Sequence, residues 1–341
     1  MAEPGEPILW SLYVYAPNKA APIFFAIAYA LSAVFHIWQC SRYQAWKLMW
    51  LHPACAVLFM AGYSLREYGA YNYLYSLTTK LPLILYILSQ VCIYICPPLL
   101  ELANYHVLGR VFAYAPSCAP LPANRVLATF GGLMLLVEAL NAVGVALVAN
   151  PSGRASSQAL GKNLTVAAIA IQVVVIVIFV CLAAVFHARF ARKRMRSRSV
   201  KIVLTVLYAS MALIFARCVF RLVEHAGNTK VDLDDIEVLR GLDPLLRYEA
   251  YFYVFEASLM LVNSWLWNVW HPGRYLPRDY RVFLAEDGTE VVGEKQDDVR
   301  PLLARTAHVL SFGMLFREKK QGARDGMHQL SDYPPASAHS A

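Results

Sequence analysis

The chain has 341 residues, of which 58% are hydrophobic and only 16% are charged, and its formal net charge is +8. So few charges argue against a soluble domain, and the long apolar blocks indicate a polytopic helical membrane protein. The positive charge does not indicate nucleic acid binding, because the Lys and Arg residues lie in loops beside the apolar blocks.

The apolar blocks are seven runs near or above the roughly 20 residues that a helix needs to cross a bilayer core. In chain order they cover about 22–38, 48–65, 81–108, 126–149, 163–187, 202–223 and 248–270. The third run contains Cys96-Pro97-Pro98, where we expect a kink, because proline removes a backbone hydrogen bond from a helix. We therefore predict an all-α membrane protein, a seven-transmembrane helix bundle.

The loops between the runs indicate the orientation of this bundle. The loop after the fifth run carries seven basic residues and no acidic one between positions 189 and 201, whereas the loop after the sixth carries an acidic cluster. Basic loops remain in the cytosol, so we predict an N-terminus outside and a cytosolic C-terminus. The predicted domains are an extracellular segment (1–21), the transmembrane domain (22–271) and a cytosolic polar tail (272–341) that is largely disordered.

The end of the sixth run holds charges that a membrane helix must keep away from lipid. Arg217, Arg221 and Glu224 are spaced by four and three residues, which stacks them on one helix face. An ionised side chain in hydrocarbon costs at least about 2.5–3.5 kcal/mol. We therefore expect this face to meet carboxylates of neighbouring helices or to line a polar cavity, with Glu256 as the first candidate partner of Arg221.

Ionisable residues in other runs lie at depths from which they can join this face. We expect them to converge on an outward-facing pocket that binds substrate. The alternative is that the charges only pair and lock the helices together, because buried ion pairs are weak evidence of function. The candidate substrate-binding residues are Arg217, Arg221, Glu224, Glu256, Glu249, Arg66 and Glu138. A second, inner group of polar residues comprises His36, Glu101, Asn104 and Arg110.

Several kinds of site are not indicated by the sequence. It contains no Walker loop, no Gly-x-Ser-x-Gly and no dinucleotide-binding glycine pattern, so we expect no enzyme and no cofactor. The nine histidines are scattered and the seven cysteines form no short-spaced pair outside the membrane, so we expect no metal site and no disulfide framework. Asn163-Leu164-Thr165 matches a glycosylation acceptor but abuts the membrane, which disfavours modification.

The motifs, taken in order, resemble the fungal lipid-translocating exporter family, the RTA-like seven-span proteins. The resemblance runs from about residue 13 to residue 275. It is carried by Tyr15-Ala16-Pro17, Gly62-Tyr63-Ser64-Leu65-Arg66, Arg217-x-x-Phe220-Arg221-x-x-Glu224, Glu249-x-x-x-Tyr253, Phe255-Glu256 and His271-Pro272-Gly273. The chain departs from the family pattern at Phe59, where a Glu is usual, at Val145, where a Gln is usual, and at Glu138 and Glu256, which replace Asp.

The resemblance implies a membrane transporter that moves amphipathic lipids or lipid-like toxic compounds, for example sphingoid long-chain bases, and so confers resistance. Its partners would be membrane lipids and amphipathic small molecules, and its location the plasma membrane. The alternative is a seven-span receptor or sensor of lipids or stress without transport activity. Cargo, direction, energy coupling and oligomeric state stay open at this point.

Overall fold

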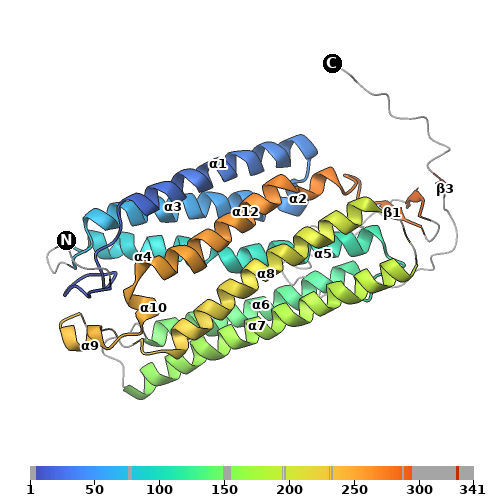
Figure 1. Ribbon diagram of the computed structural model, residues 1–341. Helices are drawn as coiled ribbons and strands as arrows, with labels where there is room; N and C mark the ends of the chain where they lie inside the picture. Colours follow the sequence, from blue (N-terminus) through green and yellow to red (C-terminus); the bar gives the residue numbers. More distant parts are fainter. Residues whose placement is uncertain are drawn as a thin grey trace, which may run out of the picture.

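The computed structural model describes residues 5–75, 79–148, 155–193, 195, 197–229, 231, 233–285, 288–293 and 328–329. Its helices run side by side in one elongated bundle (Figure 1). The long helices are α1 (Ala20–Tyr43), α3 (Leu51–Tyr71), α4 (Leu81–Tyr94), α5 (Cys96–Tyr114), α6 (Ala123–Val148), α7 (Ala155–Arg192), α8 (Arg198–Ala226) and α12 (Leu259–Val269). The short helical elements are α2 (Trp46–Met49), α9 (Ile236–Arg240), α10 (Pro244–Arg247), α11 (Glu249–Phe252), the π-helix η1 (Tyr253–Ser258) and the 3-10 helix η2 (Pro272–Arg274).

Each of the seven predicted apolar runs is mainly helical over its described residues. The expected interruption of the third run is present, since α4 ends at Tyr94 and α5 begins at Cys96. Among the described residues, α1, the pair α4–α5, α6, α7 and α8 are long and apolar enough to cross a membrane. The protein is therefore a multi-pass helical membrane protein. The helix α3 and the consecutive elements α11, η1 and α12 pack beside these segments. They do not meet both the length and the hydropathy expected of a membrane-crossing helix.

The long helices form a closed ring of neighbours. Along this ring, α1 packs on α3, α3 on α4, α5 on α6, α6 on α7, α7 on α8, α8 on α12, and α12 returns to α1. The helix α5 also contacts α3 and α8, which lie on either side of it, so it occupies the centre of the bundle. Polar side chains on α5 are consequently held inside the molecule, and Glu101 and Asn104 are both buried there.

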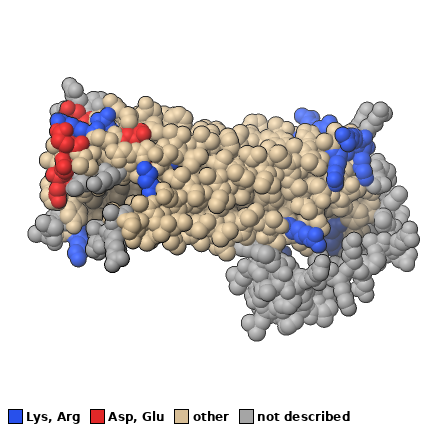
Figure 2. Space-filling model, turned by 90° about the horizontal axis from the view of Figure 1, so that it is seen from below, with Lys and Arg blue, Asp and Glu red and all other residues tan. Residues whose placement is uncertain are grey.

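The outer surface has the pattern of a membrane protein. In Figure 2 the acidic side chains gather at one end, Lys and Arg lie mainly at the two ends, and a wide belt between them is almost free of charge. Large apolar side chains point outward along the helices, and Phe24, Val34, Leu135 and Val174 are all more than half exposed. A continuous apolar surface of this size is costly in water and suits contact with lipid.

The N-terminal segment closes one end of the bundle, where α9 and α10 also lie (Figure 1). The backbone N–H of Leu12 donates to the Tyr73 carbonyl at 2.9 Å, and that of Tyr75 donates to the Trp10 carbonyl at 2.7 Å. The side chain of Val14 packs with Leu239 and Leu242, just before α10. This segment therefore ties together the two loops at that end.

A small antiparallel sheet covers the opposite end. It consists of β1 (Val282–Leu284), β2 (Glu290–Val292) and β3 (His328–Gln329) in the order β1-β2-β3, with Phe283 opposite Val291 and Val291 opposite Gln329. The hydroxyl of Tyr114, at the end of α5, donates to Glu290 at 2.5 Å. The first part of the predicted tail is therefore docked on the bundle. Disorder was predicted for most of the tail 272–341, of which residues 286–287, 294–327 and 330–341 lie outside the described residues.

Candidate functional site

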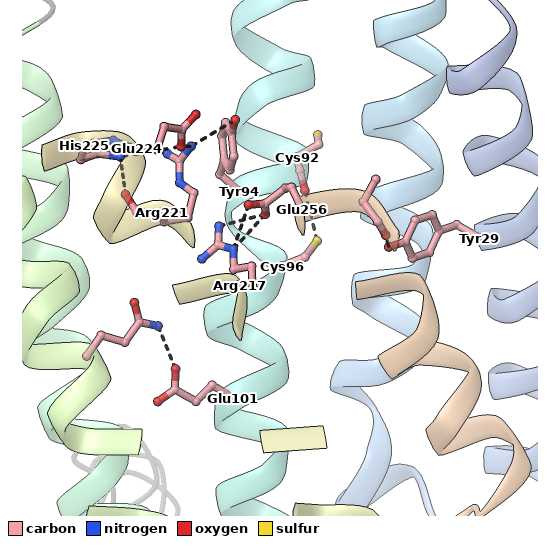
Figure 3. Close-up of polar contacts among 12 residues, drawn as sticks. Tyr29, Cys92, Tyr94, Cys96, Glu101, Arg217, Arg221, Glu224, His225 and Glu256 are labelled. Carbon is pink, nitrogen blue, oxygen red and sulfur yellow. Dashed lines mark hydrogen bonds and ion pairs between the residues drawn. The ribbon is translucent and has the colours of Figure 1, made fainter. Parts of the chain in front are cut away.

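The most enclosed ion pair in the bundle joins Arg217 on α8 to Glu256 on η1 (Figure 3). The guanidinium Nε lies 3.0 and 2.9 Å from the two carboxylate oxygens, and Nη2 lies 2.9 Å from Oε1. Both oxygens are thus bound by one fork of donors, the strongest geometry for such a pair. The sequence had suggested Arg221 as the partner of Glu256, and this pairing is wrong. Arg217 takes the carboxylate because it lies one helical turn deeper, beside η1.

Arg221 is paired along its own helix instead. Its Nη1 lies 2.5 Å from an oxygen of Glu224, three residues further along α8. The guanidinium carbon lies 4.5 Å from the centroid of the Tyr94 ring, so α4 supplies a cation–π contact to the same group. Arg217, Arg221 and Glu224 lie along α8 as predicted. Arg217 pairs with Glu256 of η1, whereas Arg221 pairs with Glu224 and contacts Tyr94 of α4.

The wide turn η1 sets the position of Glu256. A π-helical turn carries one residue more than an α-helical turn and is often found at functional sites. Phe255, next to Glu256, stacks on Phe220 of α8 with ring centroids 5.0 Å apart. This contact holds the wide turn against α8, and Glu256 is left 1% exposed, facing Arg217.

Arg66 and Glu249 form a separate pair nearer the end of the bundle that the N-terminal segment closes, with Nη2 and Oε1 3.1 Å apart. Aromatic rings surround the Arg66 guanidinium, whose carbon lies 4.2 Å from the Phe252 centroid and 4.7 Å from that of Tyr13. The other carboxylate oxygen of Glu249 accepts from the backbone N–H of Asn18 at 2.7 Å. This pair connects α3, α11 and the N-terminal segment, an arrangement typical of a structural role.

One small polar cavity lies between α4, α5, α6, α7 and α8, with a volume of about 50 Å³. This space holds only a few water molecules. It brings together three of the seven predicted residues: Arg217, Arg221 and Glu138 line it, whereas Glu256 and Glu224 bind its two arginines. Its full lining is Tyr94, Pro98, Glu138, Asn141, Ile169, Gln172, Arg217 and Arg221.

Five lining residues were not predicted as site residues, and three of them, Tyr94, Asn141 and Gln172, carry polar groups. Asn141 follows Glu138 by three residues, so its spacing on one face of the fourth run was the available signal. Tyr94 and Gln172 carried no signal of this kind, because an aromatic or amide side chain in a membrane helix more often serves packing.

The remaining predicted polar residues do not join this cavity. His36 bonds Ser264 at 3.3 Å, and Arg110 donates to the carbonyl groups of Pro277 and Asp279. Asn163 lies inside α7, where an extended acceptor segment for glycosylation is absent.

Comparisons with known proteins agree on one family. The model of the family described as RTA1 like protein matches residues 53–279. The lipid-translocating exporter-like protein RTA1 of Leptosphaeria maculans is 57% identical over 99% of this chain and 66% of its own length. A protein of the same description from Ajellomyces capsulatus is 32% identical over 70% of this chain and 75% of its own length. The probable lipid transporter atnI of Emericella nidulans is 23% identical over 78% of this chain and 68% of its own length. No solved structure matches the chain significantly.

Proposed function

The chain belongs to the family of RTA1-like proteins, and from that membership we propose that it is a transporter that moves amphipathic lipids or lipid-like compounds across its membrane. One observation carries the proposal: a polar cavity bounded by Arg217, Arg221 and Glu138 lies inside a bundle whose outer belt is apolar. Such a cavity accepts a polar headgroup while the hydrocarbon tail of the same molecule remains in lipid. The cavity must widen to admit a headgroup larger than a few waters.

The charges around the cavity favour a cationic headgroup. Arg217 and Arg221 are each neutralised by a carboxylate, Glu256 and Glu224. Glu138 has no ion-pair partner among the described residues and is the remaining charge in the wall. An ammonium group entering the cavity would pair with Glu138, as expected for a sphingoid long-chain base. Removal of toxic amphiphiles of this kind from the cell would confer resistance to them.

We further propose that the protein crosses the membrane seven times, with the N-terminus outside and the C-terminus in the cytosol. We propose the plasma membrane as its location. The N-terminal segment and the β1–β2 hairpin lie at opposite ends of the bundle, which requires an odd number of crossings (Figure 1). The loop rich in Lys and Arg between α7 and α8 supports a cytosolic position for the end that carries the hairpin.

Reconstitution tests the transport proposal. The purified full chain is placed in vesicles with a fluorescent sphingoid base, and the label in one leaflet is bleached over time with a membrane-impermeant reductant. We expect the protein to accelerate movement between leaflets, and Glu138→Gln to remove most of this acceleration. The matched control is Glu237→Gln, the same chemical change on the exposed helix α9, which should leave the rate unchanged.

Two results would contradict this proposal. Movement no faster than in protein-free vesicles would favour the receptor alternative. Full activity of Glu138→Gln would show that the headgroup does not pair with the cavity carboxylate.

A further inference from the structure

Glu101 on α5 is a buried carboxylate that the proposed headgroup site does not use. It is 1% exposed, and its Oε2 accepts a hydrogen bond from Nε2 of Gln172 at 2.8 Å. Its Oε1 accepts from the hydroxyl of Tyr105, one turn along the same helix. No cation lies within ion-pair distance of it among the described residues, in contrast to the carboxylates paired with arginines. An uncompensated charge at this depth is costly, and carboxylates in such positions are typical of proton relays.

Gln172 joins Glu101 to the polar cavity. Its side chain lines the cavity and at the same time donates to Glu101. The titratable and charged groups that face Glu101 are Tyr105 from α5, Glu138 from α6, and Arg217 and Cys218 from α8. Glu101 is therefore placed just beyond the cavity, on the side away from the end that the N-terminal segment closes.

A line of buried polar side chains continues from Glu101 toward the end of the bundle that carries the β-sheet. Asn104, one turn further along α5, donates to Oγ of Ser210 at 2.9 Å, and the indole N–H of Trp267 donates to the same oxygen at 3.1 Å. The ring centroid of His52 lies 5.5 Å from that of Trp267 and 5.4 Å from that of His36. We call these five residues, Asn104, Ser210, Trp267, His52 and His36, the inner polar seam.

The inner polar seam contains buried atoms without hydrogen-bond partners among the described residues. They are both ring nitrogens of His52 and Nδ1 of His36. Leaving such a group unpaired in the interior is destabilising. Groups of this kind therefore do not stabilise the fold. They suit a path along which protons or water molecules bind transiently.

We propose that Glu101 binds a proton that enters from the polar cavity, and that the inner polar seam leads this proton to the other end of the bundle. The step forms an O–H bond at the Glu101 carboxylate, and release breaks it as the proton passes to a water molecule of the seam. Lipid movement is thereby coupled to a proton gradient. The coupling rests on the proposed transport, whereas the proton site does not.

Infrared spectroscopy tests the proton site directly. Spectra of the full-length protein in detergent are recorded as the pH is changed, and the C=O stretching band of protonated carboxylic acids is compared with that of Glu101→Gln. We expect one titrating component to be lost in the variant and retained in Glu237→Gln. Should Glu101→Gln fail to fold, Gln172→Leu removes a donor to the same carboxylate and should shift that component. An unchanged band in both variants would overturn the proton site.

A transport measurement tests the coupling. The cargo is a fluorescent long-chain quaternary ammonium compound, which cannot carry a proton itself. We expect an imposed pH gradient to change the rate for the wild-type protein, and Glu101→Gln to move cargo at one rate with or without the gradient. Gradient dependence retained in Glu101→Gln would overturn the coupling. Absence of any transport by the wild-type protein would overturn the proposed function and the coupling together, while the infrared result decides the proton site independently.

Discussion

At the scale of single residues, Arg217 and Arg221 of α8 differ in how closely they are enclosed. The side chain of Arg217 is 8% exposed and that of its partner Glu256 is 1% exposed, whereas Arg221 is 18% exposed. Arg221 also has Tyr94 and His225 as neighbours. The charge of Glu256 is therefore compensated by one arginine in a closed environment. Glu224 is more exposed, at 10% against 1%.

This difference predicts unequal effects of removing the two arginines. Arg217→Ala leaves the Glu256 carboxylate buried without a partner, and breaking a buried pair in this way costs about 3–5 kcal/mol. Arg221→Ala should cost clearly less, and the double change Arg217→Ala with Glu256→Gln should recover part of the loss because it removes the unpaired charge. Thermal unfolding of each variant in detergent is the measurement. Equal destabilisation by the two single changes would show that enclosure does not decide the effect.

At the scale of elements, α6 and α7 approach each other through glycines on both helices. A Cβ placed on Gly144 would lie 2.4 Å from Oγ1 of Thr165 and 2.8 Å from the carbonyl oxygen of Gly161. A Cβ on Gly161 would lie 2.7 Å from the Gly144 carbonyl oxygen. Small residues at such positions allow close packing of membrane helices.

Replacing these glycines should therefore separate the two helices. Gly144→Ala or Gly161→Ala is expected to cost about 1–3 kcal/mol, the usual effect of overpacking. Gly109 in α5 is the matched control, because a Cβ there would meet only the Ala123 carbonyl oxygen at 3.5 Å. Gly109→Ala should stabilise by about 0.5–1 kcal/mol through the better helix propensity of alanine. Thermal unfolding in detergent gives both values, and a stabilising effect of Gly144→Ala would refute the close-approach argument.

The sequence was sufficient to place the helices but not their rotations. Apolar runs locate membrane helices because each must be long enough to bury its backbone in lipid, and the interruption before Pro97 follows from the chemistry of proline. The choice of Arg217 over Arg221 as the partner of Glu256 depends on the wide turn η1, which is held by packing of Phe255 on Phe220. Such a contact between distant segments leaves no periodic signal.

The N-terminal segment was less predictable still. Trp10 and Val14 have φ values of 63° and 72°, a region that L-residues, and β-branched ones above all, rarely adopt. Local preferences therefore oppose this backbone conformation. It is stabilised by contacts with Tyr73, Leu239 and Leu242, which lie far along the chain.

At the scale of the whole molecule, the loop between α7 and α8 is the feature from which orientation can be tested. Neutralising Arg192, Lys193, Arg194 and Arg196 should reduce the fraction of correctly oriented protein, since each basic residue near an anionic inner leaflet contributes about 1 kcal/mol. Protease protection of a tag placed after Ala341 measures that fraction on intact cells. Neutralising Lys19 and Lys80, near the other end, is the control and should leave orientation unchanged. Digestion of the tag on the wild-type protein from outside would reverse the proposed topology.

The three buried ion pairs also determine how the molecule responds to membrane voltage. In the pairs Arg66–Glu249, Arg217–Glu256 and Arg221–Glu224 the arginine is cancelled by the carboxylate beside it, so a shift of these pairs carries no net charge through the electric field. Moving a charged cargo across the membrane changes its free energy by about 2.3 kcal/mol per elementary charge for 100 mV. A cationic lipid leaving a cell that is negative inside meets this opposing term in full. Exchange for one incoming proton would cancel it and make the cycle electrically silent.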